Sequence, residues 1–299
     1  MARATINDVA ASAGVSTATV SRLLNGRNVS SDTAERIWKA VAELDYSPNA
    51  LTRGIFAGRS STIGVIIRDL DSPYYLELMR GIEEAATSHD SLVMFANSYS
   101  NVELEAAHVQ RMDEQRVRGL ILTGGPDLDG WARRIASTGT PCVIMNRVVE
   151  DMPPNLHTVS LDNIEAGQLV GEHLLSCGRS SIAVVTMGTR VQGLERLTGL
   201  RTVLAENGID LPDAMVAAVE GKEEVFGAVA ELLGDGSSVD AIACFSDLLT
   251  RHVYEALLEL GRNVSDDIAL IAVGDFDWSK ALDLTVVAQP TNEMGQEAA

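Results

Sequence analysis

The stretch ATINDVAASAGVSTATVSRLLNG, residues 4–26, decides the architecture of the N-terminal part of the chain. Apolar residues recur at helical spacing from Ile6 to Ala10, and Gly14 then interrupts the pattern. Ser16 can cap a second helix. The expected inward face of that helix consists of Val20, Leu23 and Leu24. Two short helices joined through a glycine turn predict a helix-turn-helix.

The outward face of the second helix carries side chains suited to contact with DNA. In a helix-turn-helix, the N-terminal end of the second helix enters the major groove. Thr17 offers a hydroxyl and Ala18 a methyl to base edges, and Arg22 can donate to both acceptors of a guanine. Thr19 and Ser21 are expected to donate to phosphates. The alternative is an ordinary capped helical hairpin with a solvated arginine.

The continuation VSSDTAERIWKAVAELDYSPNALTRGIFAGRSSTIGVII, residues 29–67, makes the N-terminal part recognisable. From Ala4 to Ile67 the chain closely resembles the DNA-binding headpiece of the LacI/GalR family of repressors, with DVA, AGVS, TVSR, LNG, YSPNA and IGV in order. The resemblance implies an all-α headpiece over residues 1–47 that binds double-stranded operator DNA. The expected DNA contacts are Thr5, Ser16, Thr17, Ala18, Thr19, Ser21, Arg22, Asn25, Tyr46, Asn49 and Ile55.

A third helix is predicted from Ser31 to Leu44, and it would close a three-helix core. Its expected core face consists of Ala34, Ile37, Trp38, Val41 and Leu44. Trp38 is therefore predicted to be a core residue and not a DNA contact.

Residues 48–60 are too polar for a core helix and too short for a stable isolated one. The resemblance implies a hinge helix that forms on operator DNA, pairs with the hinge of the second protomer and inserts an apolar side chain into the minor groove. Ile55 stands where the family has Leu, and Gly54 weakens the expected helix. The alternative is a flexible linker that never touches DNA.

Charge divides the chain unevenly. The net charge is −19, yet residues 1–60 hold seven basic and five acidic residues, and the remainder holds 16 basic and 37 acidic residues. An acidic body would leave only the basic end free to approach DNA. No apolar run reaches the ~18 residues of a membrane span, and no secretory signal begins the chain, so a cytoplasmic protein is expected. The three cysteines, Cys142, Cys177 and Cys244, are odd in number and far apart in the sequence. This spacing predicts reduced, buried thiols that bind no metal or cofactor.

The rest of the chain alternates short apolar runs with longer helical patterns, which predicts parallel α/β sheets. The predicted buried strands are residues 63–67, 92–96, 119–123, 142–145, 182–187, 241–245 and 268–273. The predicted helices are residues 75–88, 104–115, 167–176, 197–207 and 248–260. A break between two halves is expected near Pro153, Pro154 and Asn155, and two such halves place a ligand at the carboxyl ends of their strands.

The resemblance extends more loosely over this body and implies a periplasmic-binding-protein-like core of two parallel-sheet subdomains. These would be residues 61–159 with 290–299, and residues 160–289 without a final strand and helix, since the family normally continues further. An exposed sheet edge and a weakened dimer are expected from that ending.

Several positions match the effector-contacting segments of the family. DLDSPYY matches the family segment PDxxNPFF, and RLTGLRTVL matches its Arg-led helix start. For Tyr75, and to a smaller extent for Tyr74, interface or core packing is the alternative. Gly274 stands where the family has an effector-binding Asp, so Asp275 or Asp277 is expected to compensate. The segment shortened at Lys222 lacks the aromatic that the family often has there, so Trp278 is expected to supply the stacking face. The implied effector contacts are Asp69, Ser72, Tyr74, Tyr75, Thr123, Asn146, Arg147, Asp162, Arg196, Asp247, Asp275 and Trp278.

Two other classes fit less well. A free solute-binding protein would share the body but not the headpiece, and a Rossmann-type enzyme is disfavoured because GxGxxG, GxxxxGK[ST], GxSxG and HExxH are missing and the five histidines are scattered. The sequence therefore predicts a homodimeric repressor, not an enzyme, on a pseudo-palindromic operator. A small-molecule effector, a sugar or sugar derivative, would act as inducer or co-repressor.

Overall fold

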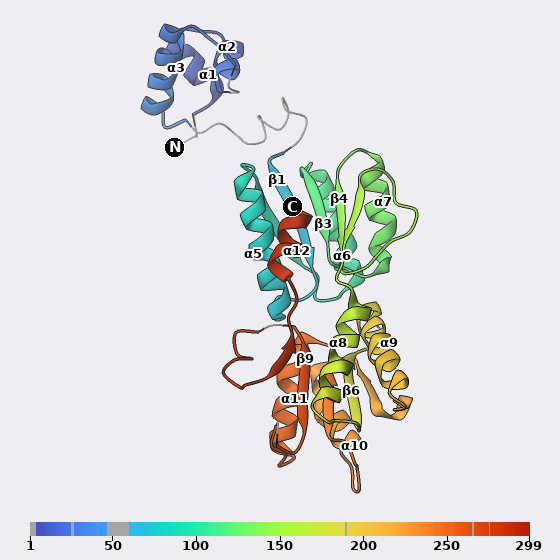
Figure 1. Ribbon diagram of the computed structural model, residues 1–299. Coiled ribbons are helices and arrows are strands. Elements are labelled where there is room, and N and C mark those ends of the chain that lie inside the picture. The colour runs from blue at the N-terminus through green and yellow to red at the C-terminus, as the bar shows by residue number, and fades with distance from the viewer. Residues whose placement is uncertain (1–3, 25–26, 47–59, 189, 265, 275) are drawn as a thin grey trace. The chain divides into compact units, whose positions relative to one another are not determined.

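The computed structural model describes residues 4–24, 27–46, 60–188, 190–264, 266–274 and 276–299 (Figure 1). They divide into two compact units, one from residues up to 61 with 115–118 and one from residues 62–114 with 119–299.

In the part of the first unit that the structure describes, three helices surround a small apolar core. The helices are α1 (Ile6–Ala13), α2 (Thr17–Leu24) and α3 (Ser31–Glu43). The buried residues are Val9, Ala10, Ala13, Val20, Ile37 and Ala40. This confirms the predicted helix-turn-helix and its third helix.

Local chemistry explains where α1 begins and ends. The Thr5 hydroxyl accepts a hydrogen bond from the backbone N–H of Asp8 at 3.4 Å, and the Asp8 carboxylate accepts one from the N–H of Thr5 at 2.8 Å. These two reciprocal bonds form a capping box, which fixes the start of the helix at Thr5. Gly14 ends the helix at φ +64°, a left-handed conformation that favours glycine.

Trp38 does not belong to the core of this unit, so that prediction is wrong. The residue is 52% exposed, whereas Ile37 and Ala40 are 0% and 2% exposed. Ile37, Ala40, Val41 and Leu44 follow the spacing i, i+3, i+4, i+7 on one stripe. Trp38 lies about 100° around the helix from Ile37 and leaves that stripe.

The second unit contains two five-stranded sheets in which the paired strands run parallel, ordered β2-β1-β3-β4-β5 and β10-β9-β8-β6-β7. The strands of the first sheet are β1 (Thr62–Ile67), β2 (Leu92–Asn97), β3 (Gly119–Leu122), β4 (Cys142–Met145) and β5 (Leu156–Val159). Those of the second are β6 (Ile182–Met187), β7 (Val216–Val219), β8 (Ala241–Cys244), β9 (Ala269–Val273) and β10 (Thr285–Val287). The predicted core of two parallel-sheet subdomains is confirmed.

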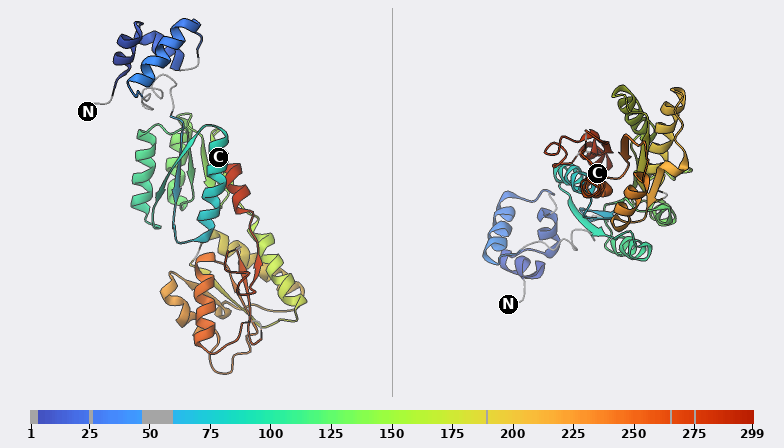
Figure 2. Two further views of the ribbon diagram at one scale, coloured as in Figure 1. Left: turned by 90° about the vertical axis from the view of Figure 1, so that its left-hand side faces the viewer. Right: turned by 90° about the horizontal axis from the view of Figure 1, so that it is seen from below.

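Helices cover both faces of the first sheet (Figures 1 and 2). They are α5 (Pro73–Ser88), α6 (Val102–Glu114), α7 (Asp129–Ser137) and α12 (Thr291–Ala298). Along β1, Ile63, Val65 and Ile67 face the cluster of α5 and α12. Gly64, on the other face, approaches Met112 of α6. Because both faces are buried, the strand is a continuous apolar run.

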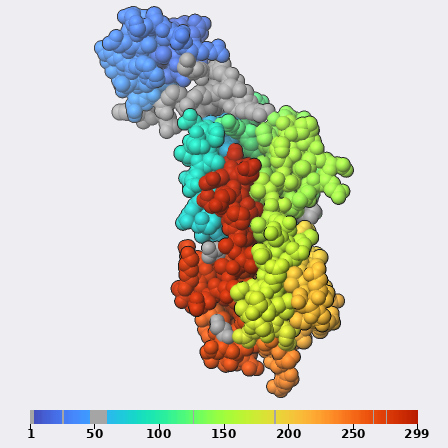
Figure 3. Space-filling view, viewed as in Figure 1, coloured from blue at the N-terminus to red at the C-terminus, as the bar shows by residue number. Residues whose placement is uncertain are grey.

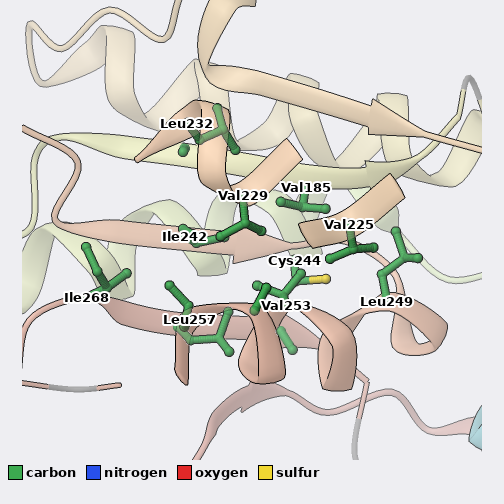
Figure 4. Close-up of a cluster of buried hydrophobic side chains, with 14 of the residues drawn as sticks. Val185, Val225, Val229, Leu232, Ile242, Cys244, Leu249, Val253, Leu257 and Ile268 are labelled. Carbon is green, nitrogen blue, oxygen red and sulfur yellow. The ribbon is translucent and has the colours of Figure 1, made fainter. Parts of the chain in front are cut away.

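The second sheet is covered in the same way. Its helices are α8 (Asn163–Ser176), α9 (Val191–Glu206), α10 (Val225–Leu232) and α11 (Asp247–Glu259). Val184 and Ala243 face α8 and α9, while Val185, Ile242 and Cys244 face α10 and α11 (Figure 4). Alternate residues of one strand therefore stabilise two separate apolar layers.

The C-terminal helix α12 returns to the first sheet, where it lies against α5 (Figure 3). Met294 and Ala298 share an apolar cluster with Leu78 and Ile82 of α5. A Cβ on Gly81 would lie 2.0 Å from the backbone oxygen of Asn292, so the two helices touch through backbone.

Four sequence expectations about this unit need correction. The strand at residues 92–97 is not buried, because it lies at a sheet edge and Leu92 and Phe95 are 71% and 52% exposed. The break does not fall at residues 153–155, since β5 follows it and still pairs with β4. Cys177 is exposed, whereas the other two cysteines are buried. The sequence also missed β5, β7, β10, α7, α10 and α12, which are all nine residues or shorter.

Candidate effector cleft and DNA-binding face

The carboxyl ends of strands from both sheets border one cleft in the second unit. Its inner chamber, about 100 Å³, adjoins an outer hollow of about 740 Å³ that shares Arg68, Asp69 and Arg190 with it. Of the residues predicted from sequence, the inner chamber is lined by Asp69, Ser72, Tyr74, Tyr75, Thr123, Asn146, Arg196 and Asp247. This is the place where open parallel sheets bind small molecules.

Arg196 is buried at the base of this chamber. Its Nε donates to Oδ1 of Asn163 at 3.0 Å and its Nη1 donates to the backbone oxygen of Phe245 at 2.9 Å. Burial lowers the pKa of Arg196 to about 10, although Asp247 nearby opposes the shift. Two of its five N–H groups are thus fixed by the protein, which orients the planar fork toward the chamber.

Asp247 joins the two sides of the cleft. Its Oδ2 accepts a hydrogen bond from the Ser72 hydroxyl and a longer one, 3.4 Å, from the backbone N–H of Tyr74. Asn146 acts similarly, because its Oδ1 accepts from the Tyr74 hydroxyl at 2.5 Å and its backbone oxygen accepts from Nε2 of Gln192 at 2.8 Å. Asp247 and Gln192 belong to the second subdomain, so the bonds that they make cross the cleft, whereas the bond between Tyr74 and Oδ1 of Asn146 lies within the first subdomain.

The two tyrosines differ in role. Tyr75 is 8% exposed and belongs to the apolar cluster of α5, while Tyr74 packs at its border. Their rings meet edge-on with centroids 5.2 Å apart. Burial raises the pKa of both phenols, and the neighbouring Tyr75 raises that of Tyr74 further. Both hydroxyls are therefore neutral donors at physiological pH.

Three predicted contacts lie outside the inner chamber. Arg147 lines the outer hollow, where its Nη2 lies 2.5 Å from Oδ1 of Asp129. Asp162 is exposed and caps α8 by accepting from the N–H of Glu165 at 2.9 Å, so its carboxylate serves the helix. Trp278 stacks on Phe276 with centroids 4.9 Å apart, away from the chamber.

The compensation expected near Gly274 is not found among the described residues. Gly274 has φ +133°, and a Cβ there would lie 2.8 Å from the Phe276 ring, so a side chain is excluded. Asp277 is exposed and lines neither chamber, and Asp275 lies outside the described residues.

Several lining residues were missed from sequence. They are Arg68, Leu161, Asn163, Thr186, Arg190, Gln192, Phe245 and Gln289. Arg68 directly follows the apolar run 63–67 and Phe245 closes the run 241–245, so position at a strand end was the available signal. Nothing local marked Arg190, which precedes α9.

In the first unit, the residues predicted for base contact are exposed on α2. Thr17, Ala18 and Arg22 are all exposed. The Ser16 and Thr19 hydroxyls lie 2.8 Å apart. The Ser16 hydroxyl also accepts a hydrogen bond from the backbone N–H of Thr19, and this bond caps the start of α2.

The other predicted DNA contacts are less exposed or serve the fold. Thr5 caps α1, Ser21 is half-buried, and half-buried Tyr46 packs against the three-helix core. Asn25, Asn49 and Ile55 lie outside the described residues.

Residues 60–298 match the family described as periplasmic binding proteins and sugar binding domain of LacI family, and residues 5–49 match bacterial regulatory proteins, lacI family. The chain belongs to the LacI family. Like its relatives in this family, it is a DNA-binding transcriptional regulator with an effector-binding domain.

Relatives of known role span nearly all of this LacI-family chain. It is 32% identical to the HTH-type transcriptional regulator PtxS of Pseudomonas putida, over 99% of this chain and 87% of that protein. It is 30% identical to catabolite control protein A of Staphylococcus aureus, over 97% of this chain and 89% of that protein.

Solved structures of other transcriptional regulators have the same fold as this chain. The Lac repressor dimer bound to operator and the anti-inducer ONPF has a TM-score of 0.84 and 28% identity, covering 99% of this chain and 90% of that chain. A CelR–cellobiose complex has a TM-score of 0.71 and 28% identity, covering 99% and 91%.

Within the described ranges, no helix is long and apolar enough to cross a membrane. The same residues contain no group of three or more His, Cys, Asp or Glu side chains that could hold a metal ion.

Proposed function

We propose that this regulator is a repressor that binds a pseudo-palindromic operator as a homodimer, and that a sugar or sugar derivative bound in the cleft controls its operator affinity. The observation that carries the effector half is the polar inner chamber, whose lining comes from both subdomains. A ligand held by groups on both sides favours the closed arrangement over the open one, which is the differential affinity a switch requires.

The hydrogen bonds across the cleft support this mechanism. Ser72 and Tyr74 donate to Asp247, and Gln192 donates to Asn146. An effector that engages Arg196 and Asp247 would compete with or extend these bonds and so shift the balance between arrangements. The predicted contact Thr123 is held by its hydroxyl's bond to the backbone oxygen of Ile66 at 3.0 Å.

The DNA half rests on the exposed face of α2. In this proposal Thr17 and Ala18 contact base edges, Arg22 reads a guanine, and Ser16, Thr19 and Ser21 donate to phosphates. We further propose that residues 48–60 form a hinge whose Ile55 enters the minor groove of the dimer's operator, with residues 1–47 as headpiece.

The domain assignment is tested by removing residues 1–59. A gel shift with operator DNA should lose the complex, while calorimetry with the effector should still detect binding. A shifted band that persists without these residues would refute the assignment. The response of the intact chain to effector gives its sign: a weaker shift identifies an inducer and a stronger one a co-repressor.

Arg22→Ala tests direct readout. Affinity for operator should fall about 10- to 100-fold relative to affinity for random DNA, since a bidentate guanine contact supplies about 1–3 kcal/mol of discrimination. Arg262→Ala, which removes an exposed charge in the other unit, is the matched control. Equal loss on both DNAs would make Arg22 a phosphate contact.

The effector is sought by a thermal-shift screen of sugars, sugar acids and nucleosides, because a ligand at 100 times its Kd stabilises the protein by about 2.7 kcal/mol. Arg196→Ala should remove the shift given by the compound that is found. An unchanged shift would overturn the assignment of the cleft as the effector site.

A further inference from the structure

The inner chamber is lined by three arginines, Arg68, Arg190 and Arg196, and by two aspartates, Asp69 and Asp247. The chain as a whole carries a net charge of −19. The arginines outnumber the aspartates of this lining, and one of them, Arg68, has an ion-pair partner outside it in Glu105 at 4.0 Å. A guanidinium that is desolvated without a close anionic partner is unfavourable, so such a cluster favours a bound anion.

The two aspartates are already engaged. Oδ2 of Asp247 accepts from Ser72 and Tyr74, and Oδ1 of Asp69 accepts from the N–H of Asp71 at 3.0 Å. These donors belong to hydroxyl and backbone groups and carry no charge. No ion pair between either aspartate and a chamber arginine is found within 4.0 Å in the part of the chain that the structure describes.

Arg68 and Arg190 retain donors for a ligand. Nε of Arg68 lies 4.0 Å from Oε1 of buried Glu105 and has no hydrogen-bond partner among the described residues. The Arg190 guanidinium makes no hydrogen bond or ion pair with the described residues, although it is half-buried. Burial and then the positive charge of Arg68 lower the pKa of Arg190, while Asp247 and Asp69 oppose that shift, so the two cations lie within each other's field and the aspartates offset part of their repulsion.

The two arginines also stand on different subdomains. Arg68 follows β1 of the first sheet, and Arg190 precedes α9, which packs beside the second sheet. Their repulsion opposes closure of the cleft when no anion is present. An anion between them removes that repulsion and adds charge-assisted hydrogen bonds from both sides.

We propose that the effector is a polyol carrying one anionic group, a carboxylate or a phosphate, which Arg68 and Arg190 clamp across the cleft while Arg196 and Asp247 hold the hydroxyl-bearing part. This inference rests on the proposed function, because it specifies the chemistry of the ligand at the same site. It makes closure of the two subdomains dependent on the anionic group.

The test is calorimetry of the full chain with matched triplets, each an aldose, its aldonate and its phosphate ester, for glucose, galactose and ribose. An anionic member should bind at least about 10-fold more tightly than its neutral aldose, and its affinity should fall with added salt. Comparison of aldonate with phosphate ester identifies which anion the clamp accepts.

Variants locate the anionic group. Arg190→Gln removes a side chain without a described partner, so folding should be unaffected, and affinity for the anionic member should fall about 10- to 100-fold. Arg68→Gln should act in the same direction. Arg262→Gln is the control, since Arg262 lies past the far end of α11, about 20 Å from Asp247 at 1.5 Å per residue.

The outcomes separate the two proposals. If an aldose binds as tightly as its anionic partners and Arg190→Gln changes neither affinity, the anionic clamp is refuted and the sugar-binding function stands. If no member of any triplet binds, the clamp is refuted, and the thermal-shift screen decides whether another sugar-type compound is the effector. Loss of the anionic ligand in Arg190→Gln but not in Arg262→Gln supports the clamp.

Discussion

Replacement of Gly167 by alanine should displace the arginine at the base of the cleft. Gly167 lies on α8 where this helix crosses α9, and a Cβ at this position would lie 2.0 Å from the backbone oxygen of Arg196. Real Cβ contacts are essentially never shorter than 3.0 Å, so α9 must retreat by about 1 Å or more. A Cβ on Gly199 of α9 would likewise lie 2.0 Å from the backbone oxygen of Ile164. The two helices are therefore in backbone contact at two points, and a local shift at Gly167 alone cannot relieve the clash.

The cost can be estimated from opposing terms. Overpacking at a site bounded by backbone costs about 3 kcal/mol, and the better helix propensity of alanine returns about 1 kcal/mol. The free energy of unfolding should therefore fall by roughly 2 kcal/mol. The Arg196 bonds of 3.0 and 2.9 Å would exceed hydrogen-bonding distance after a 1 Å shift, so effector affinity should fall about 10-fold or more.

Urea unfolding followed by circular dichroism measures the first effect, and calorimetry with the effector measures the second. Gly227→Ala is the matched control, because Gly227 lies on α10 with nothing within 4 Å of an added Cβ. That variant should gain about 0.5–1 kcal/mol and bind effector normally. If Gly167→Ala is as stable as the unaltered chain, the argument from helix contact is wrong.

Two further predictions concern burial. In the headpiece, Ile37→Ala should cost about 2–5 kcal/mol, whereas Trp38→Ala should change stability by less than about 1 kcal/mol because the ring is half exposed; equal losses in thermal melts would contradict the exposed placement of Trp38. In the native protein one thiol, Cys177, should react rapidly with a thiol reagent, since burial raises the pKa of Cys142 to about 12 and that of Cys244 to about 11. All three should react in denaturant, and rapid labelling of native Cys177→Ser would disprove this.

Local features of the sequence were enough to predict the headpiece. The Gly14 turn and the apolar spacing of α1 and α2 act within one or two helical turns, and each lies where the pattern indicated. Six of the seven short apolar runs became buried strands for a similar reason, because a strand buried on both faces must be apolar throughout. The seventh, at residues 92–96, became an edge strand.

Elements set by distant partners were not predictable in this way. Short strands such as β5 and β7 contain too few residues to show a period, and the position of β2 at an edge depends on which strands pair, not on its own apolar composition. Trp38 shows the same limit on a helix. It borders the apolar face of α3, and the width of the face that becomes buried depends on how α3 packs against the other helices, not on its own sequence.

The sequence by itself determined a helix-turn-helix followed by two parallel α/β halves, because both follow from spacing between near neighbours. The tertiary structure alone decided the chemistry of the cleft. It placed Arg68 and Arg190, more than one hundred residues apart, on the same chamber, fixed Arg196 on the Phe245 carbonyl, and moved Asp162 and Trp278 away. Convergence of this kind depends on how the two sheets pack, and no local pattern of residues records it.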